Sequence, residues 1–148
     1  MKVAISSDHA GFLLKTILVQ ELSDQGHVVI NLGTNSEDPV DYPDFAKLVA
    51  DEVIKKTCEK GIIICGSGVG ASIAANKVKG IRASVCHDTY SAHQGVEHDD
   101  MNVIVLGARI VGECLAKEIV KAFLAAKFSQ EERHQRRLKK IISLENTW

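Results

Sequence analysis

The stretch Ile62-Ile63-Ile64-Cys65-Gly66-Ser67-Gly68-Val69-Gly70 decides the fold class of this 148-residue chain. Its four leading apolar residues predict a strand that is buried on both faces, as in a parallel sheet covered by helices. The glycines predict a tight turn with exposed backbone amides, and residues 71–75 beyond it open a helix of small side chains. A strand that leads through a glycine-rich turn into a helix is typical of an α/β fold.

The same alternation of short β-branched runs and helical periodicity extends along the whole chain, which predicts repeated βαβ units. We expect one Rossmann-like, three-layer α/β domain over residues 1–148, with a five-stranded parallel sheet in the order 2-1-3-4-5 and helices on both faces. The expected strands are 3–6, 27–32, 62–65, 82–86 and 103–106, and the expected helices are 10–25, 44–57, 88–97, 115–126 and a C-terminal helix at 129–146. That last helix is assigned from a capping-box pattern, Ser129 with Glu132.

Composition and charge exclude several classes of protein. The net charge of −1 gives no general attraction for a polyanion, so we expect no nucleic-acid partner. No apolar stretch approaches the roughly 20 residues that span a bilayer, and the N-terminus lacks the layout of a secretory signal, so we expect no membrane partner and a cytoplasmic location. Four widely spaced cysteines without a CxxC pair predict free thiols and no metal site.

Ligands of open parallel sheets bind beyond the carboxyl ends of the strands. Three segments follow strands there: Ser7-Asp8-His9, Cys65 with its glycine loop, and His87-Asp88. A fourth segment, His98-Asp99-Asp100, precedes the fifth strand, so it reaches this edge only if its loop extends over the sheet. We expect Asp8, Cys65 and His98 to converge there.

The glycine loop has two readings, an oxyanion or phosphate site and a turn that lets a helix pack closely on a strand. Its spacing is G-x-G-x-G after the third strand, so it lacks the third glycine of the dinucleotide-binding G-x-G-x-x-G motif. It also differs from the G-x-x-x-x-G-K-[ST] phosphate loop. The sequence therefore favours a small anionic ligand over a nucleotide.

Single residues leave alternatives open as well. Cys65 is either a thiol activated by a helix N-terminus or a small buried hydrophobe. Asp8 and His9 either hold a sugar phosphate or form a helix cap with an exposed neighbour. His98 suits proton transfer near neutral pH, although a surface histidine is the plainer reading.

Three arginines, Arg109, Arg133 and Arg137, are candidates for a phosphate clamp, because a guanidinium makes planar, multidentate contacts. Arg133 and Arg137 share one face of the C-terminal helix at i, i+4. The alternative is a solvated helix face, supported by the pair Glu132 and Arg136.

Motifs spread over nearly the whole chain resemble the type B ribose-5-phosphate isomerases. They are Ser7-Asp8-His9-Ala10-Gly11-Phe12, Asp41-Tyr42-Pro43, Cys65-Gly66-Ser67-Gly68-Val69-Gly70, Ala74-Ala75-Asn76-Lys77, Gly80-Ile81-Arg82-Ala83 and Arg133-His134-Gln135. The galactose-6-phosphate isomerase subunits share the fold and the glycine loop but lack the histidine found here at 98. The resemblance therefore favours the pentose phosphate branch.

The resemblance implies a reversible conversion of D-ribose 5-phosphate to D-ribulose 5-phosphate that needs neither a metal ion nor an organic cofactor. It implies that His98 opens the furanose ring, that Cys65 moves a proton between C2 and C1 through an enediolate, and that Ser67 supports Cys65 or a substrate oxygen. Loop amides would stabilise the oxyanion. The implied substrate-binding residues are Asp8, His9, Tyr42, Gly66, Gly68, Val69, Gly70, Asp99, Arg109, Arg133 and Arg137.

Two positions distinguish this chain within the resemblance. Some members have a glutamate base after the glycine loop, but Ala71 stands here, so the cysteine variant applies. Asp99 replaces a common asparagine, and its carboxylate would repel an enediolate, so we do not count it among the core catalytic residues. The resemblance also implies a homodimer or a dimer of dimers, with shared active sites and residues 129–146 packed on a partner subunit.

Two rival functions remain at this point. A non-catalytic sensor of phosphosugars or nucleotides would use the same loop and arginines and would bind without turnover. An isomerase of six-carbon sugar phosphates, such as allose 6-phosphate or galactose 6-phosphate, would differ in pocket length, which sequence does not reveal.

Overall fold

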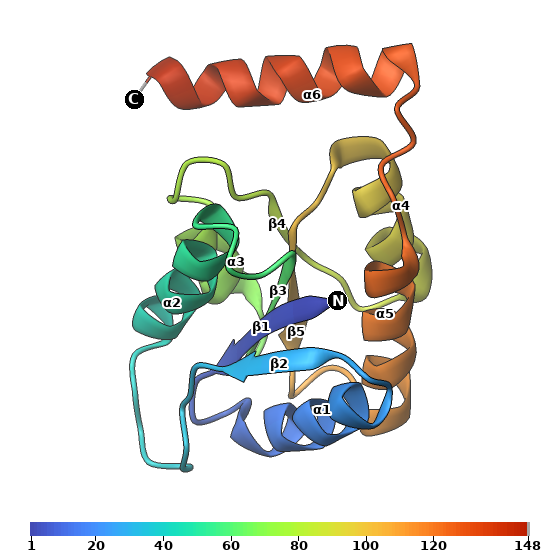
Figure 1. The fold of residues 1–148 in the computed structure, drawn as a ribbon. Coiled ribbons are helices and arrows are strands. Elements are labelled where there is room, and N and C mark those ends of the chain that lie inside the picture. Colours follow the sequence, from blue (N-terminus) through green and yellow to red (C-terminus); the bar gives the residue numbers. More distant parts are fainter. Residues whose placement is uncertain (148) are drawn as a thin grey trace.

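The computed structural model describes residues 1–147 as five parallel strands and six α-helices (Figure 1). The strands are β1 (Lys2–Ser7), β2 (Val28–Asn31), β3 (Lys60–Cys65), β4 (Ala83–Val85) and β5 (Val103–Gly107). The helices are α1 (Phe12–Asp24), α2 (Tyr42–Ile54), α3 (Val69–Ala75), α4 (Thr89–Asp99), α5 (Glu113–Ala125) and α6 (Glu132–Leu144), followed by a 3-10 turn, η1 (Glu145–Thr147). The α/β class is confirmed.

The strand order differs from the predicted one. It is β2-β1-β3-β5-β4, so β5 takes the inner position that we expected for β4. The reason lies in side-chain burial: all five residues of β5 are buried, whereas β4 has three residues, none of them fully buried. A strand that is apolar at every position belongs inside a sheet, and a short, half-exposed one belongs at its edge.

Helices cover both faces of the sheet and form two apolar cores. One core joins β1, β3 and β5 to α1, α4 and α5, and includes Leu18, Ile62 and Phe123. The other joins the opposite face to α2 and α3, and includes Val49 and Ile63. Because both faces are covered, ligands can approach the sheet only at its ends or at its edge strands, β2 and β4. Within residues 1–147, no helix combines the length and the apolarity needed to cross a bilayer.

The helix α6 stands apart from these layers, across one end of the molecule (Figure 1). It begins at Glu132, and its N-cap is Glu131, whose side chain makes no capping hydrogen bond. The predicted capping box is therefore wrong. The hydroxyl of Ser129 is used elsewhere, at 2.6 Å from Nδ1 of His134.

Candidate active site

The ends of β1 and β3 lie side by side where the strand order reverses, which is where α/β sheets bind ligands. Asp8 follows β1 directly and is 7 % exposed. Its Oδ1 accepts a hydrogen bond of 3.1 Å from the amide of Gly11, and its own amide donates to the carbonyl of Ile64. These bonds fix Asp8 beside Cys65, the last residue of β3.

The turn after Cys65 folds back over the sulfur. The amide of Gly68 donates to Sγ at 3.1 Å, and Gly68 adopts a positive φ of 87° that a glycine accommodates without strain. Ser67 and Val69 on either side are exposed, and the Ser67 hydroxyl accepts from the Val69 amide at 3.3 Å. The loop thus combines a thiol, a hydroxyl and backbone amides in six residues.

Two further side chains lie against this turn, and His9 follows Asp8 directly after the end of β1. The guanidinium of Arg109 lies against Gly66, and the Arg109 amide donates to the Gly66 carbonyl at 3.0 Å. The ring of Tyr42 covers Gly70, where an added Cβ would lie 2.5 Å from Cζ of the ring. His9 accepts a hydrogen bond at Nδ1 from the Val40 amide at 3.2 Å, so Nε2 is the nitrogen left for a ligand.

We call this group the glycine-loop site. It comprises Asp8, His9, Tyr42, Cys65, Gly66, Ser67, Gly68, Val69, Gly70 and Arg109. Ten of the fourteen residues predicted to form the site thus gather at one end of one chain. The glycine-loop site brings together hydrogen-bond donors that can bind an anion and a thiol that can exchange a proton.

His98 does not join them, and the expected convergence within one chain is wrong. The helix α4 begins after β4 at the carboxyl edge and runs back to the start of β5, so His98 lies near the opposite edge. The five residues of β5 alone separate the two edges by roughly 15 Å. The loop before β5 does not extend over the sheet, because Asn102 is tied to the amide of Gly61 at the start of β3.

At this opposite edge His98 stacks on His134 of α6, with ring centroids 3.9 Å apart and an angle of 27° between the planes. Nδ1 of His98 lies 2.8 Å from the amide nitrogen of Gln94. Arg133 and Arg137 are exposed on the same helix as His134, and Arg133 pairs with Glu131 at 2.8 Å. The predicted pair between Glu132 and Arg136 is not among the ion pairs of the described residues.

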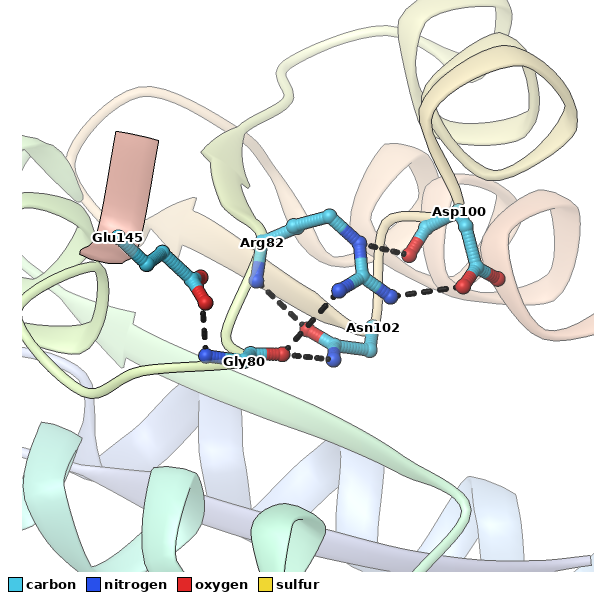
Figure 2. Close-up of polar contacts among 5 residues, drawn as sticks. All are labelled: Gly80, Arg82, Asp100, Asn102 and Glu145. Atoms are coloured by element: carbon cyan, nitrogen blue, oxygen red, sulfur yellow. Dashed lines mark hydrogen bonds and ion pairs between the residues drawn. The ribbon is translucent and has the colours of Figure 1, made fainter. Parts of the chain in front are cut away.

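We call Ser129, His98, His134, Arg133 and Arg137 the paired-histidine cluster. Its position depends on a set of polar contacts at the turn between α4 and β5 (Figure 2). Arg82 donates to the carbonyl of Asp100 at 2.8 Å and to its carboxylate at 2.7 Å. Figure 2 also shows Glu145, which accepts from the Gly80 amide at 2.9 Å. This contact ties the far end of α6 to the loop before β4.

The remaining predicted residue, Asp99, is half-buried and lines a cavity of about 520 Å³. The cavity lies between α6 and the β4 edge, among Ile81, Met101, Ile141 and Leu144. No residue of the glycine-loop site lines it. Cys65 itself is only 5 % exposed, so a single chain offers little access to its sulfur.

Two of the other cysteines, Cys58 and Cys86, are buried packing residues. Burial raises the pKa of Cys86 to about 11 and also raises the pKa of Cys58. Cys114 is exposed on α5, and all four thiols are free. Cys65 is therefore the only cysteine that combines an amide contact at sulfur with neighbours suited to bind an anion among the described residues.

Sequence reasoning missed His134, Gln94 and the clamp formed by Arg82 and Asp100. A signal for His134 was present, since it lies at i, i+4 from Leu138 and i, i+7 from Ile141 on the apolar side of a basic helix. A histidine among apolar helix positions indicates a buried polar contact. Its partner was not predictable, because α4 and α6 meet only in the folded chain.

Comparison with known proteins places this geometry in a family. The chain matches the Ribose/Galactose Isomerase family over residues 3–141. It is 47% identical over 144 residues to ribose-5-phosphate isomerase B of Escherichia coli strain K12, across 97% of this chain and 96% of that protein. It is also 45% identical over 147 residues to a putative sugar phosphate isomerase of Bacillus subtilis strain 168, across 98% of this chain and 97% of that one.

Solved structures agree with this match. The ribose-5-phosphate isomerase B of Clostridium thermocellum superposes with a TM-score of 0.97 at 47% identity, over 99% of each chain. The enzyme of Mycoplasma genitalium, solved with bound ribulose-5-phosphate, gives a TM-score of 0.93 at 43% identity, over 99% of this chain and 97% of that one. The resemblance drawn from the motifs is confirmed, and the chain belongs to the ribose/galactose isomerase family.

Proposed function

We propose that this protein interconverts D-ribose 5-phosphate and D-ribulose 5-phosphate as an aldose-ketose isomerase of the pentose phosphate pathway. The observation that carries the proposal is Cys65, whose sulfur lies inside an amide-lined turn at the switch point of the sheet. The activity predicted from the sequence agrees with the names of relatives that share nearly half of its residues, one of which was solved with the ketose product.

The glycine-loop site accounts for the isomerisation step. Cys65 takes the proton from C2 of the open-chain aldose and returns it to C1, while the carbonyl oxygen at C1 becomes a hydroxyl and the C2 hydroxyl becomes the new carbonyl. Backbone amides of the loop stabilise the negative charge on the enediolate oxygens. Asp8 and Tyr42 hold sugar hydroxyls, and His9 with Arg109 binds the phosphate.

The second half of the site comes from another copy of the chain in this proposal. His98, Arg133 and Arg137 lie at the wrong edge to serve Cys65 of their own chain, so a partner subunit's cluster completes each site in a homodimer or a dimer of dimers. Three apolar side chains of the C-terminal segment support this: Ile141, Ile142 and Leu144 are 39 to 62% exposed. A helix with an unburied apolar side is suited to pack on a second subunit.

Replacement of the thiol tests the isomerase proposal. We expect Cys65→Ala to lower kcat for ribulose 5-phosphate formation by at least about a thousandfold, because the proton acceptor is removed. Cys86→Ala is the matched control, since it removes another buried thiol of the same chain. Turnover that survives in Cys65→Ala would rule out Cys65 as the base.

Subunit mixing tests the shared site separately. Cys65→Ala and His98→Ala are each inactive on ribose 5-phosphate in this scheme, but refolding them together creates hybrid dimers with one intact site. We expect about a quarter of the wild-type activity to return, since half of the dimers are hybrids and each holds one good site. No recovery, with hybrids detected by mass, would mean that each chain builds its own site.

Two rivals give different results in the same preparation. A sensor raises its Tm with ribose 5-phosphate but shows no turnover. An isomerase of six-carbon substrates has a higher kcat/KM on allose 6-phosphate than on ribose 5-phosphate.

We further infer that the enzyme works in the cytoplasm, where its four free thiols remain reduced.

A further inference from the structure

The contact between His98 and His134 has no role in the proposed proton transfer at Cys65. His134 is 1% exposed, yet it is the only residue of α6 that is buried, in a helix otherwise open to solvent. Its Nε2 has no hydrogen-bond partner among the described residues. Burying an imidazole with one nitrogen lacking a hydrogen-bond partner lowers the free energy of unfolding. The presence of His134 at this position therefore needs a reason other than stability.

The protonation state of His134 follows from its neighbours. Ser129 accepts the Glu131 amide at 3.3 Å and lies 2.6 Å from Nδ1 of His134, and we assign the proton of this second contact to the Ser129 hydroxyl. Nδ1 is then an acceptor, and the neutral ring carries its proton on Nε2.

Charge around the ring favours the same neutral form. Burial lowers the pKa of His134, and the nearby His98, Arg133 and Arg137 lower that pKa further, while only Glu131 opposes them. Burial and three of the four ionisable neighbours on α4, α6 and the segment before α6 thus favour the uncharged form of His134.

His98 is held from two sides. The side-chain amide of Gln94, one turn earlier on α4, lies 2.8 Å from Nδ1 of His98. The ring centroid of the stacked His134 lies 3.9 Å from the ring centroid of His98. With Nδ1 occupied and one face covered, Nε2 is the atom through which His98 exchanges a proton. The stacked neighbour fixes the plane in which that nitrogen points.

We propose that His134 is a positioning residue for ring opening, which holds His98 by stacking and adds no positive charge beside it. This rests on the proposed function. Ring opening breaks the bond between C1 and the ring oxygen, removes the proton of the anomeric hydroxyl and adds a proton to the ring oxygen. His98 takes the proton of the anomeric hydroxyl at Nε2 and gives a proton to the ring oxygen. It is transiently an imidazolium whose Nδ1–H donates to the Gln94 side chain once that amide turns its oxygen toward the ring. A second stacked imidazolium would repel this charge.

The test separates ring opening from proton transfer at carbon. Ribulose 5-phosphate cannot form a furanose, because its O5 carries the phosphate, so exchange of its C1 hydrogen with D2O reports the Cys65 step alone. We expect His134→Ala to slow conversion of ribose 5-phosphate on the order of 10 to 100-fold. Exchange at C1 should stay within about threefold of wild type, because the glycine-loop site is untouched.

The variant His134→Phe keeps a flat ring and tests stacking directly. It should retain conversion within about fivefold, since the exposed Ser129 hydroxyl can turn to water. His93→Phe, which lies on α4 with His98 and is in edge contact with Tyr90, is the control and should leave both reactions unchanged. Equal losses of conversion and exchange in His134→Ala, or a Phe variant as slow as the Ala variant, would overturn the proposal.

A spectroscopic readout does not depend on turnover. In ¹⁵N-histidine NMR spectra we expect His134 to show the neutral form protonated at Nε2 and to take up its second proton at a lower pH than an exposed histidine, and Ser129→Ala to lose the Nε2 preference. A His134 that titrates like an exposed histidine contradicts the proposal. If the wild-type protein neither converts ribose 5-phosphate nor exchanges C1, the proposed function fails first, whatever the NMR result.

Discussion

The glycine-loop site and the paired-histidine cluster are built in opposite ways. The first depends on backbone: amides of a six-residue turn and the ends of β1 and β3, with Asp8 and Cys65 tied to neighbours three residues away. The second depends on side chains from α4 and α6 that are 36 residues apart in sequence. The backbone site tolerates no change of position, whereas the side-chain cluster can be weakened in steps.

Apart from removal of the Cys65 thiol, the largest expected effect comes from crowding the glycine-loop site. An added Cβ at Gly107 would lie 2.7 Å from the backbone oxygen of Ser67, so Gly107→Ala must displace the loop. We expect kcat/KM to fall about 100-fold, as for a misplacement near 1 Å. Gly112→Ala, where nothing lies within 4 Å, is the control and should keep full activity. Equal activity of the two variants would mean that the loop is more adaptable than its backbone contacts imply.

A smaller effect is expected from the ion pair between Arg82 and Asp100, which lies beside the paired-histidine cluster (Figure 2). Arg82→Met removes both bonds to Asp100 from a side chain that is 17% exposed, so the free energy of unfolding should fall by about 2 kcal/mol in urea titration. Asp100→Asn keeps an acceptor and suits the left-handed backbone, with φ of 49°, so it should lose about 1 kcal/mol or less. The reverse order of stabilities would contradict the assigned contacts.

Variants of Glu145 test how the position of the paired-histidine cluster affects substrate binding. Its single bond to the Gly80 amide fixes the end of the helix that carries Arg133 and Arg137. Glu145→Ala should raise KM for ribose 5-phosphate about threefold with kcat little changed, because one hydrogen bond is lost far from the reacting atoms. Glu145→Gln retains an acceptor and should resemble wild type. A change in kcat instead of KM would place Glu145 in the chemical step.

A last prediction concerns stability alone and serves as a reference outside both sites. Burial lowers the pKa of Lys60 to about 8 from its ordinary 10.5, although its Nζ donates to the carbonyls of Phe123 and Ala126. Between these values the unfolded chain holds a proton that the folded chain has lost, so stability rises with pH across this window. Lys60→Met should flatten that rise in urea titrations at pH 8 and 10. An unchanged slope would show that Lys60 keeps its proton in the fold.

Much of the fold was predictable because its signals are local. The apolar run Ile62–Cys65 and the glycines after it indicated a parallel sheet and its ligand edge, which pointed to Asp8 and Cys65, whereas Tyr42 came only from the family resemblance. The burial of β5 was also readable, since residues 103–106 are as apolar as residues 62–64. The prediction placed the fourth and fifth strands next to each other in chain order, with the fourth inside. The predicted strand order was wrong for that reason.

The sequence by itself determined the strands, the helices and a thiol beside an amide-lined turn, because each depends on residues within about one turn of the chain. Only the tertiary structure decided which strand lies inside the sheet, that α4 carries His98 away from Cys65, and that His134 covers His98. Contacts of this kind follow from how apolar faces pack across long stretches of sequence, and no local pattern specifies the partner.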